Sequence, residues 1–358
     1  MTQNIPTRAS DGASHPALVF DRVTKSYGEV DAVADVDLEV EAGELICLLG
    51  SSGSGKTTLL RLVAGFEQPT RGRIRIDGSD VSRLSPADRG LGMVFQNYAL
   101  FPHLTTQKNI EYGLKMRGWD RAARADRARE MLERMRLGGF GGRLPSELSG
   151  GQQQRVAIAR ALAYEPKILL MDEPMGALDK ALKQDLLQEV RRVHREFGTT
   201  MLYVTHDREE ALTLADRVAV MRNSQLIACD TVRDLYERPR SGYLAGFFSG
   251  ANLFTGESRL GFALGAERTE GGTVACVRPG DLRIGIPDLD AMDSGTVVDA
   301  LYLGESMQLS VAVPLRDGSA ETVKVHLPTP AAAGIGIGDT VSIGVDRRDA
   351  MLLPSGDS

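Results

Sequence analysis

The hydrophobic pattern of the first two thirds of the chain alternates between short apolar runs and amphipathic segments. The runs ELICLL (44–49), KILLMDE (167–173) and TTMLYVTH (199–206) are apolar at successive positions, which is typical of strands buried on both faces of a parallel sheet. The segments KTTLLRLVAG (56–65) and KQDLLQEVRRVHREF (183–197) have helical spacing instead. This alternation predicts an α/β fold, with a mostly parallel sheet covered by helices on both faces.

The strand signal disappears between residues 97 and 166. The segments TTQKNIEYGLKMRG (105–118), RAARADRAREMLERM (121–135) and SGGQQQRVAIARALAYEP (149–166) all have helical spacing. We therefore expect a helical subdomain over residues 97–166, inserted between strands of the sheet.

Beyond residue 240 the pattern becomes one of short valine-rich strands, such as TVACV (273–277), separated by Gly, Pro and Asp. This texture is typical of a small all-β barrel or sandwich. We expect a sheet domain over residues 17–240 and a C-terminal all-β domain over residues 241–358. The polar start of the chain, residues 1–16, lacks the apolar middle of a signal peptide and is expected to be a disordered leader.

Composition narrows the class of protein. A hydrophobic share of 42% and a charged share of 25% are those of an ordinary globular protein. The net charge of −6 argues against a nucleic-acid partner. The chain has no apolar run near the length of about 18–20 residues that a membrane-spanning helix needs. We therefore expect any contact with a membrane to come through a partner.

The sequence GSSGSGKTT follows the buried run 44–49 and opens the helix at 56–65. It fits the phosphate-binding pattern G-x-x-x-x-G-K-[ST]. Glycine permits a tight turn and close approach of the backbone to a ligand, and successive N–H groups together with a helix N-terminus attract phosphate. A flexible linker would not be flanked by a buried strand and a helix. The candidate nucleotide-binding residues are Gly50, Ser51, Ser52, Gly53, Ser54, Gly55, Lys56, Thr57 and Thr58.

A carboxylate pair, Asp172 and Glu173, ends the apolar run 167–173. Buried carboxylates are costly unless a cation or a proton compensates them. Ligands bind at the carboxyl edge of a parallel sheet, so Mg²⁺ with ATP is the expected compensation. We assign Asp172 to the metal with the Thr57 hydroxyl, and Glu173 to the attacking water.

The stretch LSGGQQQR (148–155) supplies a second anion-binding helix start. Its residues Ser149, Gly150, Gly151 and Gln152 could be no more than a helix cap. One compact ATP site does not need two such cradles, whereas two identical chains arranged head-to-tail do. We therefore expect these residues to close the nucleotide site of a second copy.

With these motifs in this order, the chain resembles the ATPase subunits of ATP-binding cassette (ABC) transporters over nearly its whole length. The resemblance implies a P-loop NTPase fold and further site residues. Tyr27 in KSYG is similar to the aromatic residue that stacks on adenine, and Gln96 in VFQNYALF to the glutamine that contacts Mg²⁺. His206 in YVTHD is similar to the switch histidine at the γ-phosphate, and Asp179 in GALD to the loop residue that crosses the dimer interface. Members of the family often have serine where Gly176 stands, and whether the role of that hydroxyl is kept here stays open.

The tail resembles the OB-like (TOBE) regulatory domain of importer ATPases, on the stretch VRPGDLRIG (277–285). The resemblance implies ATP hydrolysis for solute uptake on the cytoplasmic face of the inner membrane, with transmembrane permease subunits and, through them, a solute-binding protein. Polyamine import is the leading expectation, and iron(III), thiamine, phosphonate, sulfate and sugar import stay open. A non-transport ABC ATPase acting on nucleic acid or the ribosome is the alternative of a different class.

Overall fold

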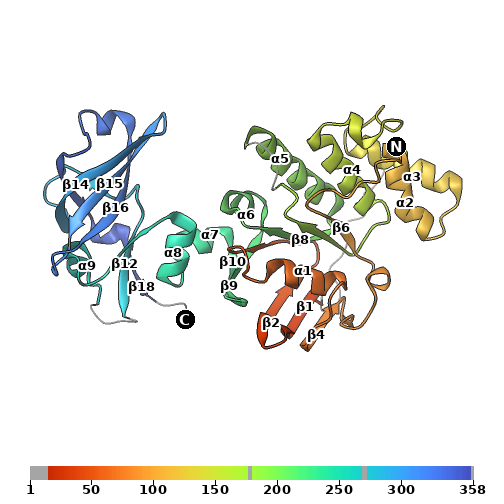
Figure 1. Ribbon diagram of the computed structural model, residues 1–358, viewed down its shortest axis with the longest axis horizontal. Helices are drawn as coiled ribbons and strands as arrows, with labels where there is room; N and C mark the ends of the chain where they lie inside the picture. Colours follow the sequence, from red (N-terminus) through yellow and green to blue (C-terminus); the bar gives the residue numbers. More distant parts are fainter. Residues whose placement is uncertain (1–14, 176–179, 268–271, 356–358) are drawn as a thin grey trace, which may run out of the picture. The chain divides into compact units, whose positions relative to one another are not determined.

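The computed structural model describes residues 15–175, 180–267 and 272–355. Chain contacts divide the protein into two units, with the division after Val232, and Figure 1 shows the elements of each unit. The boundary expected after residue 240 lies between helix α7 (Val232–Glu237) and helix α8 (Gly242–Ser249). The leader residues 1–14 and the expected site residues Gly176 and Asp179 lie outside the described residues.

A six-stranded sheet of order β10-β9-β3-β8-β7-β6 forms the centre of the first unit. Neighbouring strands from β9 to β6 are parallel, and β10 pairs with β9 in the antiparallel sense. All five residues of β3 are buried, as the continuous apolar run predicted. The strands are β3 (Leu45–Leu49), β6 (Gly92–Val94), β7 (Ile168–Asp172), β8 (Thr200–Thr205), β9 (Arg217–Arg222) and β10 (Gln225–Thr231).

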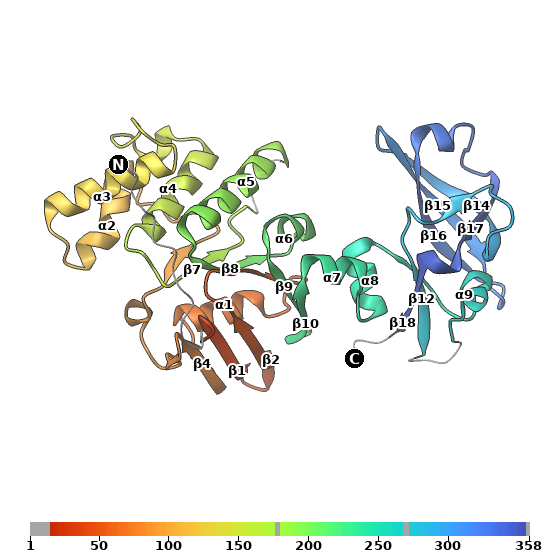
Figure 2. The same ribbon diagram turned by 180° about the vertical axis from the view of Figure 1, so that it is seen from behind.

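Helices cover both faces of this sheet, which confirms the predicted fold class. Helix α1 (Lys56–Ala64) packs against β7 and β8, and helix α6 (Arg208–Leu214) against β3 and β8. Figures 1 and 2 show α1 on one side of the sheet, with α6 and α5 (Lys180–Phe197) on the other. The loop of residues 50–55 and helix α1 therefore follow a strand that is buried on both faces.

A second, antiparallel sheet of order β2-β1-β4-β5 packs on the same core. Phe20 of β1, Leu60 of α1 and Val204 of β8 belong to one hydrophobic cluster. This shared core joins β1, the strand that ends at Tyr27, to α1. The strands are β1 (Leu18–Tyr27), β2 (Val30–Val40), β4 (Arg71–Ile76) and β5 (Ser79–Asp80).

The segment between β6 and β7 contains three α-helices, within the range where a helical subdomain was expected. Helices α2 and α4 contact each other, and α3 packs against both. Met131 of α3 and Val156 of α4 are fully buried. The helices are α2 (Thr106–Met116), α3 (Arg121–Arg134) and α4 (Gly150–Leu162).

The second unit is built mainly of antiparallel strands, in sheets of order β11-β12-β18 and β13-β17-β14-β15-β16. Alternate residues of its long strands point inward, and Leu309, Val325 and Ile343 share its core with Leu260 of helix α9 (Arg259–Leu264). The strands are β11 (Asn252–Phe254), β12 (Thr273–Val277), β13 (Arg283–Ile284), β14 (Ala291–Tyr302), β15 (Ser306–Pro314), β16 (Ala320–Pro328), β17 (Thr340–Val345) and β18 (Ala350–Pro354).

Strand β10 and the short helices α7, α8 and α9 are absent from the sequence-based expectations. In β10 only Ala228 is buried, so the strand has no apolar alternation. Helix α8, with the sequence GYLAGFFS, is apolar nearly all round and shows no amphipathic stripe. Helices α7 and α9 have six residues each, too few for a periodic signal.

Candidate functional site

The loop of residues 50–58 joins the buried strand β3 to helix α1, and the neighbouring backbone dictates its glycines. A Cβ at Gly50 would lie 2.2 Å from the carbonyl oxygen of Met221, and a Cβ at Gly55 2.3 Å from that of Ala32. Gly53 and Gly55 also have φ of 80° and 100°, in the left-handed region that favours glycine. The two glycines of the motif are therefore required for the loop to fit between β9 and β2.

Lys56 is buried within this loop, where only 4% of the residue is exposed. Its Nζ donates to the carbonyl oxygens of Gly50 at 2.9 Å and Ser51 at 2.8 Å. Burial lowers the pKa of Lys56, while the charges of Glu173 and Asp172 act in the opposite direction. The lysine is thus a buried cation held by carbonyl groups and facing two carboxylates.

The rest of the loop offers groups suited to an anion. Gly55 is the residue that caps α1, and Lys56, Thr57 and Thr58 form its first turn, where free N–H groups and about half a positive charge favour phosphate. The Oγ of Ser54 is buried and has no hydrogen-bond partner among the described residues. Ser51, Ser52 and Gly53 are exposed at the mouth of the loop. This cradle fits a polyphosphate ligand.

The carboxylates of Asp172 and Glu173 lie at the carboxyl end of β7. The pKa of Asp172 is raised, first by burial and then by the charge of Glu173, against the opposing charges of Arg61 and Lys56. Two like charges side by side favour binding of a cation. Thr57 provides a hydroxyl, Gln96 an amide and Asp172 a carboxylate, which are oxygen ligands of the kind that Mg²⁺ prefers.

Glu173 has a strained backbone, with φ of 41°, in a region that costs of order 1–3 kcal/mol for a residue other than glycine. Its N–H donates to the carbonyl oxygen of Val204 at 3.0 Å. Its Oε2 lies 3.1 Å from Nδ1 of His206. The structure therefore brings together the two residues that the sequence assigned to water and γ-phosphate, from the ends of neighbouring strands β7 and β8.

Gln96 and Tyr27 are exposed residues at or just beyond the ends of strands β6 and β1. Gln96 is exposed two residues beyond β6, the strand that pairs with β7. Tyr27 ends β1 and is 49% exposed, as a ring that receives a ligand should be. Lys25 Nζ lies 5.0 Å from the centre of the Tyr27 ring and 2.9 Å from an oxygen of Glu67.

Sequence reasoning missed Lys25 and Glu67 as supports of the Tyr27 ring. Lys25 stands two residues before Tyr27 on the same strand, so both side chains share one face of the sheet. That spacing could have identified Lys25 as a neighbour of Tyr27. Glu67 lies beyond α1 in the sequence, and no local pattern links it to Tyr27.

The LSGGQ stretch forms a helix tip that lies apart from this chain's own nucleotide loop. Ser149 caps α4: its Oγ accepts from Gln152 N–H at 3.4 Å, and its own N–H donates to Gln152 Oε1 at 3.0 Å. In the described part of the chain, no hydrogen bond joins Ser149, Gly150 or Gly151 to residues 50–58. Within the described residues of one chain, the two cradles are therefore not linked by hydrogen bonds.

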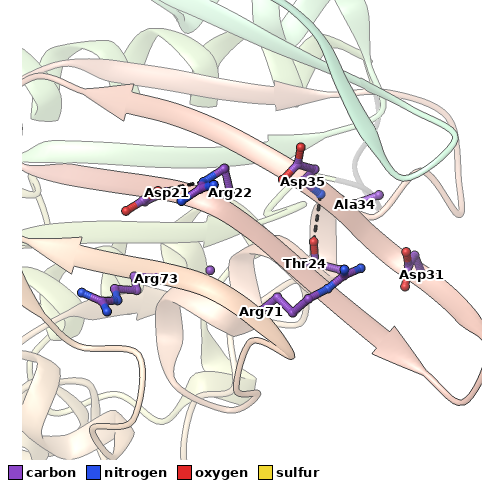
Figure 3. A pocket seen from close by; sticks show the side chains of 9 residues that line it. Asp21, Arg22, Thr24, Asp31, Ala34, Asp35, Arg71 and Arg73 are labelled. Atoms are coloured by element: carbon purple, nitrogen blue, oxygen red, sulfur yellow. Dashed lines mark hydrogen bonds and ion pairs between the residues drawn. The ribbon is translucent and has the colours of Figure 1, made fainter.

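A cavity of about 820 Å³ lies elsewhere, on the antiparallel sheet. Figure 3 shows arginines and aspartates of β1, β2 and β4 around it. Asp21 contacts Arg22 and Arg75 at its edge, at 3.6 and 3.4 Å. Acidic and basic side chains both line this open cavity. Its lining therefore has no predominant sign of charge that would favour a charged ligand.

Comparisons with known proteins give matches in both units of the chain. The ABC transporter family model matches residues 33–176, and the TOBE domain model matches residues 275–353. The chain is 42% identical to the spermidine/putrescine import ATP-binding protein PotA of Thermobifida fusca, over 95% of this chain and 94% of that protein. It is 42% identical to the Fe(3+) ions import ATP-binding protein FbpC of Rhizobium etli, over 82% and 87%.

The sulfate/thiosulfate import ATP-binding protein CysA of Synechococcus elongatus is 43% identical, over 93% of this chain and 95% of that protein. Among solved structures, the dimeric post-hydrolysis state of the ATP-binding cassette MJ0796 bound to ADP and Pi matches with a TM-score of 0.53 and 35% identity. That match covers 60% of this chain and 99% of the other.

The buried position of Lys56 leads to a binding prediction. Lys56→Ala removes the cation that faces the phosphates, and we expect ATP affinity to fall at least about tenfold, the loss of one charge-assisted contact. Titration calorimetry of the purified chain measures this. Lys115→Ala, in the last turn of α2, is the control and should bind ATP as the parent does. Unchanged affinity of the Lys56 variant would remove the loop from nucleotide binding.

Proposed function

The chain belongs to the ATP-binding subunits of ABC importers, with a C-terminal TOBE domain, and from this premise we propose how its residues hydrolyse ATP and what the hydrolysis serves. Members of this family are ATPases, and this chain is one. The observation that carries the proposal is the contact between Glu173 and His206, beside the loop that holds Lys56.

ATP is the substrate, and its phosphates lie along the N–H groups of residues 50–58. When ATP binds, the Lys56 ammonium leaves the carbonyl oxygens of Gly50 and Ser51 and binds the oxygens of the β- and γ-phosphates. The buried cation therefore keeps oxygen partners in both states. Tyr27 stacks on the adenine ring. Each step uses positioning and charge, which is most of what phosphoryl transfer requires.

Thr57, Gln96 and Asp172 are the residues that would hold Mg²⁺. When bound, Mg²⁺ neutralises charge on the β- and γ-phosphate oxygens. The raised pKa of Asp172 supports this assignment, because a cation beside the carboxylate relieves the repulsion from Glu173.

Glu173 orients and deprotonates the attacking water, and His206 holds the γ-phosphate from the next strand. The contact of 3.1 Å between their side chains sets both groups on the same side of the phosphate. Glu173 also has a strained backbone, as residues at functional sites often do. The two residues act as a unit, so neither replaces the other.

A second copy completes the site. In a head-to-tail dimer, Ser149, Gly150, Gly151 and Gln152 of one copy close the nucleotide on the other, and Asp179 crosses the interface. Two observations support this arrangement: the cap at Ser149 is exposed, and the related cassette MJ0796 is a dimer in its state bound to ADP and Pi. Hydrolysis then requires dimerisation.

The work done is solute uptake through separate transmembrane permease subunits, supplied by a solute-binding protein. In the described part of the chain, every helix is too short or too polar to span a bilayer. We place the chain peripherally on the cytoplasmic face of the inner membrane. No nucleic-acid partner is part of the proposal.

Polyamine import is the proposed specificity, supported by the near full-length match to PotA of Thermobifida fusca. Iron(III) and sulfate import are the competing assignments, since FbpC and CysA relatives are similar to the same degree. The transported solute does not touch this subunit, so the residues of the nucleotide site do not distinguish the three.

The role of Glu173 can be tested by removing its charge alone. Glu173→Gln should bind ATP with the parent affinity and lose at least about 100-fold in turnover, the usual worth of a general base. Phosphate release at saturating ATP measures the rate, and Glu39→Gln, on the exposed face of β2, is the matched control. Turnover of the Glu173 variant within about threefold of the parent would exclude Glu173 from the chemistry.

Dimer closure is tested at the cap of α4. In the Glu173→Gln background, Mg²⁺–ATP should convert monomer to dimer in light scattering, and adding Ser149→Arg should abolish the conversion by filling the space for the γ-phosphate. Ser146→Arg, three residues earlier and also exposed, should still dimerise. Equal dimerisation of the two arginine variants would refute the head-to-tail arrangement.

The solute is identified in the full transporter. Purified with its permease and solute-binding protein in lipid vesicles, the complex should hydrolyse ATP at least about tenfold faster with spermidine or putrescine, because ligand favours the closed state. Iron(III), sulfate and maltose are tested in parallel. Stimulation by one of these, without stimulation by polyamines, would reassign the solute.

A further inference from the structure

A charged network joins helix α5 to the segment that carries His206. The Nζ of Lys183, in the first turns of α5, lies 2.6 Å from Oε1 of Glu210 and also pairs with Oδ2 of Asp207. The hydroxyl of Tyr203 donates to Oε2 of Glu210 at 2.8 Å. The network thus links α5, strand β8 and helix α6.

Asp207 is the residue through which the network reaches the site. Its Oδ1 caps α6 by accepting the N–H groups of Glu209 at 2.7 Å and Glu210 at 3.4 Å. Its own N–H donates to Oγ1 of Thr205 at 2.9 Å. Because Asp207 directly follows His206 in the chain, its hydrogen bonds restrain the backbone from which the His206 side chain projects.

Charge balance makes Lys183 the essential member. The side chain of Glu210 is only 4% exposed and that of Asp207 32%, so two carboxylates share one partly buried cation. Burial lowers the pKa of Lys183, but its hydrogen bonds to Asp207 and Glu210 outweigh burial and raise the pKa overall. Without the lysine, a buried Glu210 and the cap Asp207 would repel each other.

We propose that Lys183 is a positioning residue for ATP hydrolysis: its ion pairs with Asp207 and Glu210 hold His206 against Glu173. The proposal rests on the role given above to His206. Lys183 itself is remote from the phosphates in this scheme, so its loss should change the rate of hydrolysis and leave the binding of ATP unchanged.

The first experiment compares turnover with ATP affinity in the full-length chain. For Lys183→Met we expect kcat to fall about tenfold, with KM for ATP within about twofold of the parent. Lys183→Arg keeps the charge and should recover at least about half of kcat. Arg192→Met is the matched control, because Arg192 stands on the same helix and pairs with Glu189 and Glu196 of that helix. It should keep the parent kcat.

The second experiment asks whether Lys183 acts through His206. Single-turnover rates, measured with enzyme in excess so that slow variants stay measurable, are compared for Lys183→Met, His206→Ala and the double variant. Action through His206 predicts that Lys183→Met slows the parent about tenfold and slows His206→Ala by less than about twofold.

Two results would overturn the proposal. One is a tenfold loss from Lys183→Met in both backgrounds, which would mean an effect independent of His206. The other is a loss of kcat in Lys183→Met that is fully explained by a smaller folded fraction, as thermal unfolding would show. In that case Lys183→Arg would also fail to restore kcat. A parent-like rate for His206→Ala alone would instead refute the role of His206 in the proposed function, and so separates the two failures.

Discussion

The burial of one lysine opposite two carboxylates is the constraint on which the site depends. Lys56 lies inside a turn whose carbonyls hold its ammonium, and Asp172 and Glu173 end the neighbouring strand β7. These charges lie at the carboxyl edge of a parallel sheet, where adjoining strands place their terminal side chains together. In the proposed function, the polyphosphate balances the charge of Lys56 and the metal balances the charges of Asp172 and Glu173. Binding of the ligand therefore also relieves the electrostatic cost of burying these groups.

A single chain carries its two anion-binding helix starts on separate elements. Helix α1 begins at the loop that follows strand β3, whereas α4 begins at Ser149 in the segment between β6 and β7. Within the described residues no hydrogen bond connects the two. A second copy supplies the missing half in the proposed dimer, and this couples hydrolysis to movement of whole subunits. In the proposal made for Lys183, a charged network within one chain leads from α5 to the segment that carries His206.

Much of the fold could be predicted from the sequence because the inner strands of the six-stranded sheet are apolar and the longer helices are amphipathic. Leu45–Leu49 and Ile168–Asp172 are strands where the runs indicated them, and the helical subdomain lies where the strand signal vanished. Strand β10 could not be predicted, since as an edge strand it buries only Ala228. Helix α8 lacks a polar face and therefore a helical period.

The residues of the candidate site likewise differ in how far the sequence alone could predict them. Lys56, Asp172 and Glu173 belong to contiguous motifs, and their neighbourhood follows from the order of strands. The contact of His206 with Glu173 required knowledge that β7 and β8 are adjacent. Lys183, Glu210 and Glu67 had no motif, because each acts across elements distant in sequence. Tertiary pairing of charges is not encoded in any local pattern.

The crowding around Gly50 and Gly55 has a consequence for interpreting inherited or engineered defects. A methyl group at either position collides with main-chain oxygens of Met221 or Ala32 before any nucleotide is present. Variants at these glycines would therefore lower the amount of intact subunit, and their loss of uptake would say nothing about chemistry. Genetic screens scored by growth alone would count them with active-site lesions, although the damage arises during folding.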